Sequence, residues 1–175
     1  KIQKYYHIAK NSLYKLNRSI TGLGTRKTLE IIKNEFPKLK IKKIKSGTKV
    51  FDWNIPPEWN VKEAYILDKN QNKIIDLKNN NLHLVGYSIP VNKILLKRDL
   101  LKKLFYLKKQ PKAIPYITSY YKKTWGFCVS YNQFKKIKSK YKSSDRFKIV
   151  IKSSFNKVGN LNYGELVLKG TSKRE

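Results

Sequence analysis

The hydrophobic positions at the start of the chain recur at the spacing of a helix. Residues 2–16 carry apolar side chains three and four positions apart, which predicts a first helix with one apolar face. A loop with two glycines follows, and Thr25 is a suitable N-cap for a second helix over residues 26–36. Two cations, Arg26 and Lys27, occupy the first turn of that helix, where its dipole disfavours them. This suggests an anionic partner near residues 22–27.

From residue 39 the apolar positions change to a period of two, which is typical of β-strands. We predict strands over residues 39–44, 48–55, 61–67, 73–77, 82–88, 146–151 and 161–168. Polar turns separate several of them, and Pro56-Pro57 interrupts the series at a candidate domain border. Between the predicted strands that end at residue 88 and those that begin at residue 146, the pattern predicts three more elements. They are a helix over residues 99–107, a strand centred on residues 125–129 and a helix over residues 131–137.

Seven aromatic residues and the single cysteine, Cys128, gather between residues 114 and 134. Aromatic side chains at this density either fill a core or line a groove, and the core is the favoured interpretation. The Tyr120-Tyr121 pair, followed by two lysines, could instead stack on bases or sugars. No histidine, aspartate or glutamate lies in this stretch. It is therefore a packing centre or a binding surface rather than a reaction centre.

The formal charge of +29 is the strongest feature of the composition. Such a field attracts nucleic acid and anionic surfaces. The excess is nearly all lysine, however, and the lysines are spread along the chain. Dedicated nucleic-acid readers depend more on arginine, so we interpret the charge mainly as a solvated surface. A basic, non-enzymatic binding module for nucleic acid or anionic glycan remains the alternative, with nucleic acid the disfavoured ligand.

Catalytic and metal-binding patterns are absent from the sequence. The eleven acids are scattered, and two histidines and one cysteine do not form a zinc site of a common type. Cys128 has no evident base beside it. No apolar run approaches the roughly 20 residues of a membrane span, and no signal peptide is visible. We expect a cytoplasmic protein, in keeping with one cysteine. Because the chain contains no methionine, we also expect it to belong to a longer polypeptide.

Several stretches together resemble a known family. They are residues 16–29, 46–53, 81–91, 114–121, 125–130 and 163–166. In this order they are similar to the bacterial aminopeptidase-like domain proteins, which carry a domain of unknown function inside a zinc-exopeptidase fold. The resemblance implies an α/β (α+β) fold. Residues 1–55 would begin the core, residues 56–150 would form a small β-rich inserted domain, and residues 151–175 would return to the core.

The same resemblance implies a zinc aminopeptidase-like hydrolase linked to polysaccharide biosynthesis. Its zinc ligands follow a strand that corresponds to the one ending near Leu168, so none can be assigned here. We expect no zinc and no activity from this chain alone. Its implied partners are the remainder of the same polypeptide and a small peptide or amino-acid-like substrate. Homo-oligomer formation is left open.

Five residues are the predicted substrate contacts. Arg18 and Arg26 would lie near an anionic group of the substrate, and Tyr120, Tyr121 and Trp125 would be aromatics at the rim of the site. A structural role is the alternative for all five. If the chain is only half of a folding unit, the strands after residue 151 would lack neighbours and leave an exposed sheet edge.

Overall fold

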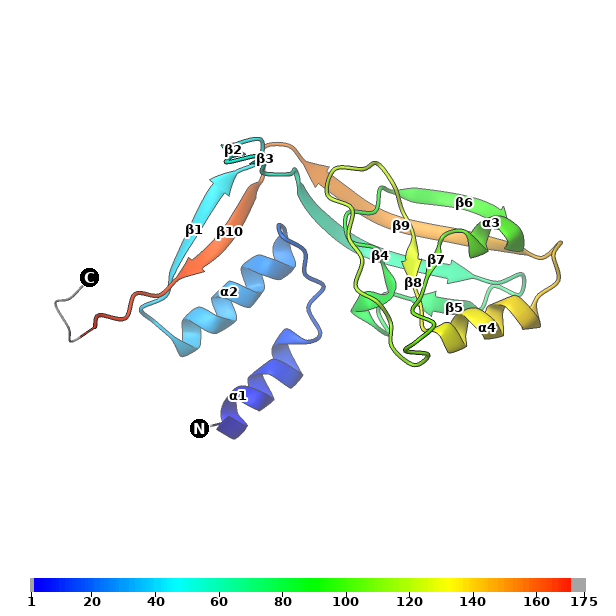
Figure 1. Ribbon diagram of the computed structural model, residues 1–175, viewed down its shortest axis with the longest axis horizontal. Coiled ribbons are helices and arrows are strands. Elements are labelled where there is room, and N and C mark those ends of the chain that lie inside the picture. Colours follow the sequence, from blue (N-terminus) through cyan, green and yellow to red (C-terminus); the bar gives the residue numbers. More distant parts are fainter. Residues whose placement is uncertain (1, 171–175) are drawn as a thin grey trace. The chain divides into compact units, whose positions relative to one another are not determined.

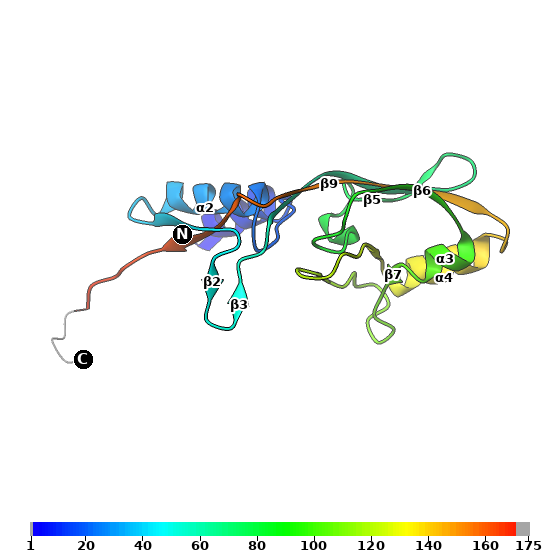
Figure 2. The same cartoon turned by 90° about the horizontal axis from the view of Figure 1, so that it is seen from above.

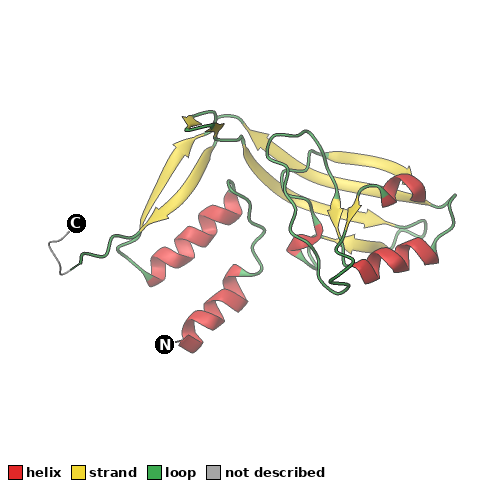
Figure 3. Cartoon of the chain, viewed as in Figure 1, coloured by secondary structure: helices red, strands yellow, loops and turns green. Residues whose placement is uncertain are grey.

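The computed structural model describes residues 2–170, which form two compact units (Figure 1). The first unit combines the residues up to Glu58 with those from Asn156 onward, and the second unit is Trp59–Phe155. Helices and small sheets are mixed in this chain (Figure 3), which confirms the predicted mixed α/β class. The predicted domain borders after residues 55 and 150 stay predictions. No helix within the described residues is long and apolar enough to cross a membrane.

The described part of the first unit contains three helical segments and two pairs of strands. Helix α1 (Ile2–Ile8) continues into a π-helical turn, η1 (Ala9–Leu13), and α2 (Leu23–Glu35) follows after a loop. Strand β1 (Lys40–Lys45) pairs antiparallel with β10 (Asn160–Glu165), so that Lys40 faces Glu165 and Lys45 faces Asn160. Strands β2 (Lys49–Val50) and β3 (Trp53–Asn54) form a short hairpin that projects from the unit (Figure 2).

Helix α2 packs on the β1–β10 pair where glycine makes room for it. Leu29 of α2 and Leu39 before β1 both lie 3.1–3.3 Å from the position that a Cβ atom on Gly164 would take. At the other end of the helix the preceding loop comes so close that a Cβ on Gly24 would be 1.8 Å from the Asn17 carbonyl oxygen. Gly24 in the first turn of α2 and Gly164 in β10 are therefore requirements of close packing.

The second unit is built on a four-stranded sheet with the order β5-β4-β9-β6. Its strands are β4 (Glu58–Leu67), β5 (Lys73–Asp76), β6 (Val91–Leu96) and β9 (Arg146–Asn156). Pairs β4–β5 and β6–β9 are antiparallel, and Figure 1 shows β4 and β9 running in opposite directions. Strands β7 (Leu104–Phe105) and β8 (Phe127–Cys128) form a short parallel pair. Helices α3 (Lys97–Leu101) and α4 (Tyr131–Lys140) and a 3-10 turn, η2 (Asn81–His83), complete the unit.

The core of the second unit contains most of the fully buried side chains of the structure. Phe147, Ile149 and Ile151 alternate along β9 and are at most 1% exposed. Tyr87 stacks on Trp59 with ring centroids 5.7 Å apart. Phe127, Cys128 and Val129, from the aromatic stretch, are completely buried. The favoured core interpretation of that stretch therefore holds at its centre.

Two predicted strands are wrong. Residues 48–55 form the β2–β3 hairpin because the chain turns at Phe51, whose φ of 51° is left-handed. Residues 82–88 begin in η2 and then make only single bridges, at Leu84 and Gly86, and Tyr87 also has a positive φ. In residues 82–88 the apolar side chains pack on the core from irregular backbone, whereas in residues 48–55 only Ile55 is buried.

Three helix predictions need correction. The first helix ends at Leu13 and closes with a π turn, and none of its residues is buried. Helix α2 begins at Leu23 with Gly22 as N-cap, so Thr25 lies inside the helix and its hydroxyl donates to the Ser19 carbonyl. The predicted helix over residues 99–107 is the short α3, because the chain extends into β7 three residues after Leu101.

Candidate functional site

Both predicted substrate-binding arginines lie in the first unit. Arg18 is exposed, and its Nη1 donates a hydrogen bond of 2.8 Å to the Leu13 carbonyl. Arg26, in the first turn of α2, donates from Nη1 and Nη2 to the two carboxylate oxygens of Glu58 at 2.8 and 2.7 Å. This bond to Glu58 raises the pKa of Arg26. Both guanidinium groups thus have partners within the chain, and their contact with a substrate anion stays a prediction.

The Glu58 carboxylate joins three parts of the first unit. Besides the two bonds from Arg26, its Oε2 accepts the backbone N–H of Asn160 at 3.2 Å. The Glu58 side chain is only 7% exposed. Gly159 passes so close that a Cβ there would be 2.3 Å from the Glu58 Cβ. Of the two cations predicted to face an anion, Arg26 therefore does meet one, and it is a carboxylate of the same chain.

The three predicted rim aromatics lie in the second unit, in different surroundings. Tyr120 is half-buried, with its ring edge-on to Tyr87 at 5.0 Å, and Tyr121 is 64% exposed. Trp125 is only 6% exposed, and the ammonium groups of Lys93 and Lys103 lie 5.0 and 5.2 Å from its ring centroid. The structure brings the two tyrosines together at 6.5 Å. The role of these three aromatics at a rim stays a prediction.

The described residues do not fit a zinc site. Within residues 2–170 no three His, Cys, Asp or Glu side chains are grouped so that they could hold a metal ion. His83 is buried, and its Nδ1–H donates to the Cys128 carbonyl at 2.8 Å. Burial lowers the pKa of His83, which favours the neutral ring. Burial also raises the pKa of the Cys128 thiol to about 11, so this thiol stays protonated at neutral pH.

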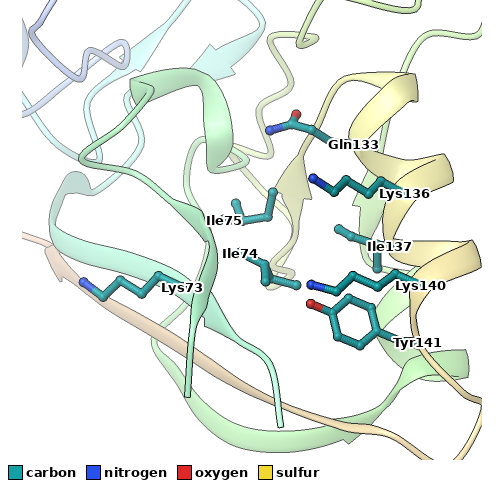
Figure 4. Close-up of a pocket in the computed structure, with 8 residues that line it drawn as sticks. All are labelled: Lys73, Ile74, Ile75, Gln133, Lys136, Ile137, Lys140 and Tyr141. Carbon is teal, nitrogen blue, oxygen red and sulfur yellow. The ribbon is translucent and has the colours of Figure 1, made fainter. Parts of the chain in front are cut away.

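A cavity of about 340 Å³ lies between β5 and α4 of the second unit (Figure 4). That volume is near the lower end of the range of small-molecule sites. Its lining residues are Lys73, Ile74, Ile75, Gln133, Lys136, Ile137, Lys140 and Tyr141. The four that belong to α4 follow each other at intervals of three, one and three residues, and so share one helix face. This face is turned toward β5.

The N-terminal cap of α4 fixes the orientation of Gln133. Ser130 Oγ accepts the Gln133 backbone N–H at 3.1 Å, and Gln133 Oε1 accepts the Ser130 backbone N–H at 2.8 Å. Because a backbone N–H can only donate, the amide oxygen is the atom that faces it. The NH₂ group of Gln133 is then directed toward the cavity, as Figure 4 shows.

Charges around the cavity are only partly compensated. Lys73 is paired with Asp76 at 3.0 Å and lies 4.5 Å from the centroid of the Tyr65 ring. The ammonium nitrogen of Lys140 lies over the Tyr141 ring, 5.2 Å from its centroid. In the part of the chain that the structure describes, neither Lys136 nor Lys140 has a carboxylate partner. Two positive charges are therefore available to an anion in the cavity.

The acids bonded to the cavity lining are already engaged. Asp68 Oδ2 accepts the Tyr141 hydroxyl at 3.0 Å, and its Oδ1 accepts two backbone N–H groups of the β4–β5 turn. Burial alone would raise the pKa of Asp68, but these hydrogen bonds outweigh it and the pKa lies below its usual value. Burial and Asp68 together raise the pKa of Tyr141 to about 12. Tyr141 is therefore a neutral donor to Asp68.

The family of the chain follows from comparison with known sequences. A family described as a domain of unknown function (DUF2172) matches residues 58–154, which is more than half of the chain. The match coincides almost completely with the second unit, Trp59–Phe155, which contains the four-stranded sheet, the aromatic core and the cavity. The chain belongs to this family.

A curated protein and a crystal structure, both from Clostridium acetobutylicum, extend the match beyond that domain. A protein named "Putative polysaccharide biosynthesis protein with aminopeptidase-like domain" is 44% identical over 163 residues, which are 93% of this chain and 36% of the relative. A crystal structure described as a "putative peptidase" aligns with a TM-score of 0.78 at 41% identity, over 93% of this chain and 39% of that one. The predicted resemblance to aminopeptidase-like domain proteins is confirmed. The chain spans little more than a third of these relatives.

Sequence reasoning missed Glu58 and the cavity. Glu58 is 32 residues from Arg26 and 102 from Asn160, so no local pattern joins them. The cavity did leave a signal in the helix of residues 131–140. Lys136 and Lys140 are four positions apart, which places like charges side by side and slightly destabilises a helix. Such a pair beside Ile137, an inward residue, was the available sign of a cationic site.

Proposed function

We propose that this chain is the non-catalytic part of a zinc aminopeptidase-like hydrolase that acts in polysaccharide biosynthesis. The names of the two relatives support the reaction class and the biological role. The described residues supply no zinc site, so the metal ligands would come from the remainder of the same polypeptide. A small peptide or amino-acid-like molecule is the proposed substrate, and the cytoplasm the proposed location.

The observation that carries this proposal is the unfinished state of the first unit. Helix α2 has no buried residue, and within residues 2–170 the sheet beside it contains only β1 and β10. Large apolar side chains stay exposed at the two ends of this pair: Val158 before β10, and Val167 and Leu168 after it, are 69–87% exposed. A helix that buries no residue beside so small a sheet indicates an element that packs on a further part of a larger fold. We assign it to the rest of the polypeptide, which would extend the two-stranded sheet into a core.

Within that enzyme the described residues would bind and orient substrate rather than perform chemistry. Zinc, held by the remainder of the polypeptide, would supply Lewis-acid activation of the scissile carbonyl. Of the five predicted contacts, Arg18 and Tyr121 keep accessible side chains, and each is proposed as a substrate contact by itself, without a common site. Arg26 and Trp125 have strong partners within the chain, and their substrate role would require those contacts to be exchanged.

Elemental analysis tests this proposal. The 175-residue chain and the longest native form of the protein are purified with zinc present, and the zinc content of each is measured. We expect one or two zinc ions per long polypeptide and none on the 175-residue chain, with aminopeptidase activity only in the long form. Absence of zinc from both would contradict the metallopeptidase proposal. Stoichiometric zinc on the 175-residue chain would contradict the assignment of the ligands to the remainder.

A binding role without catalysis is the second candidate function. The observation that favours it is the cavity with two uncompensated lysines, Lys136 and Lys140. Anionic glycan fits this local feature better than nucleic acid does, because a nucleic-acid surface requires a continuous cationic track along the backbone. This candidate requires that the long form bind glycan and lack hydrolytic activity.

A further inference from the structure

We propose that the cavity between β5 and α4 binds an anionic sugar, a pyranose ring that carries a carboxylate or a phosphate group. Lys136, Lys140 and Gln133 would hold the anionic group, and Ile74, Ile75 and Ile137 would contact the ring. The anionic part of this ligand is argued from the cavity alone. The sugar part rests on the proposed role in polysaccharide biosynthesis.

The polar groups that reach the cavity from α4 are donors. Figure 4 shows the side chains of Lys136 and Lys140 extending from α4 toward β5, on the same side as the Gln133 amide nitrogen. The Gln133 amide oxygen accepts a hydrogen bond from the Ser130 N–H, and the Tyr141 hydroxyl donates a hydrogen bond to Asp68. An ammonium group has no acceptor capacity. A ligand that presents several acceptor oxygens, above all a charged one, satisfies this set.

The cavity disfavours a competing internal anion. Asp76 is bonded to Lys73 and to the backbone N–H of Lys78, and Asp68 is bonded to Tyr141 and the turn. Burial opposes ionisation of Asp76, but these bonds outweigh it and keep its pKa below the usual value. Both carboxylates therefore stay charged and fixed at neutral pH. Lys136 and Lys140 are exposed and hydrated, and within the described residues no carboxylate pairs with them, so an external anion meets no internal competitor.

Apart from Lys73, which is paired with Asp76, the rest of the lining consists of three isoleucines and Tyr141, which favours a ligand with an apolar face. Ile75 and Ile137 are 2% and 5% exposed, so they form a fixed surface at the base of the cavity. The C–H face of a pyranose ring can pack on such a surface while its substituents reach the donors. Inorganic phosphate would use the lysines only. A neutral sugar would leave both ammonium charges without a partner.

The experiment measures binding to the 175-residue chain by ¹⁵N NMR. The probes are glucuronate and glucose 1-phosphate, with glucose and inorganic phosphate as the matched neutral and ring-free compounds. We expect saturable shifts of the amide signals of residues 73–75 and 133–141 with the two anionic sugars, and affinities at least about tenfold weaker for glucose and phosphate. The two anionic arms separate a carboxylate ligand from a phosphate ligand.

A matched variant separates the cavity from the general positive field. Lys136→Gln and Lys140→Gln should each weaken glucuronate or glucose 1-phosphate binding by about fivefold to tenfold. Lys138→Gln removes the same charge from the opposite face of α4 and should change the affinity less than twofold. Equal loss in all three variants would overturn the proposal, because it would indicate attraction to net charge. Shifts absent from the cavity, or equal affinity for phosphate, would overturn it as well.

These readouts are independent of zinc content and hydrolysis. A protein without zinc could still bind glucuronate in this cavity, and a zinc enzyme could fail to do so. Failure of the cavity proposal and failure of the proposed function are thus distinguishable.

Discussion

At the scale of single residues, Glu58 is the position on which the first unit depends most. We expect Glu58→Gln to reduce the free energy of unfolding by about 2–3 kcal/mol, because the amide cannot accept both Arg26 bonds and the Asn160 N–H. Urea unfolding followed by circular dichroism measures the change. The control is Glu165→Gln, which removes the exposed pair with Lys42 and should cost less than about 1 kcal/mol. Equal effects of the two variants would contradict the assignment of Glu58 as a buried junction.

Cys128 provides a second test at this scale. Its side chain is completely buried and its pKa is raised to about 11, so very little thiolate is present at pH 8. We expect the folded chain to resist alkylation by iodoacetamide, and the urea-unfolded chain to react at least about a hundredfold faster. Mass spectrometry of timed samples measures both rates. Comparable rates in the two states would show that the β8 region opens readily.

Predicting a site residue from sequence succeeds only where its partners are local. The first turn of α2 carries cations that indicate an anion, and an anion is present in the form of Glu58. Its identity depends on a contact 32 residues away, which the helix pattern does not contain. Trp125 shows the same limit. Its alternation in a strand favours the core, but only the packing around it shows that Lys93 and Lys103 lie over its ring.

At the scale of elements, the β4–β5 hairpin gives the structure a defined acid sensitivity. The folded pKa of Asp68 is lower than its unfolded value of about 3.9, because bonds from Asn70, Asn72 and Tyr141 outweigh burial. The stabilisation is therefore complete above about pH 5 and is lost as the pH falls through the folded pKa. We expect the urea concentration at the unfolding midpoint to decrease as the pH is lowered below about 4. The Asp68→Asn variant should show a flatter dependence of this midpoint on pH. An unchanged slope in the variant would contradict the role of Asp68.

Elements whose turn chemistry is visible in the sequence were predicted well. Strands β4 and β5 flank a polar turn at residues 68–72, and the predicted hairpin lies where the structure has it. The β2–β3 hairpin was missed because its turn uses Phe51, a residue that gives no turn signal and is 91% exposed. Strand β6 was also not predicted. It is an edge strand whose Ile94 points to solvent, so its apolar residues do not alternate with the sheet faces.

At the scale of the whole molecule, the two units differ in the core that each contains. The second unit buries Trp59, Tyr87, Phe127 and Phe147, whereas the first has few fully buried apolar side chains. We expect a polypeptide of residues 58–156 to fold alone and to unfold cooperatively on heating, as circular dichroism and dispersed NMR spectra would show. Residues 2–54, expressed separately, should remain largely unfolded, because β1 would lack β10. A disordered 58–156 polypeptide would contradict the independence of the second unit.

The pairing of β1 with β10 constrains the order in which the chain acquires its structure. Lys42 and Glu165 are 123 residues apart in sequence, so a ribosome must release nearly the whole chain before these strands can meet. Closing so long a flexible loop is entropically unfavourable. Once the second unit has formed, however, β4 and β9 are neighbours and hold the two connections together. The outer pair then closes a much shorter effective loop. Substitutions that slow folding of the second unit should consequently delay the first by the same amount, even where they touch none of its residues.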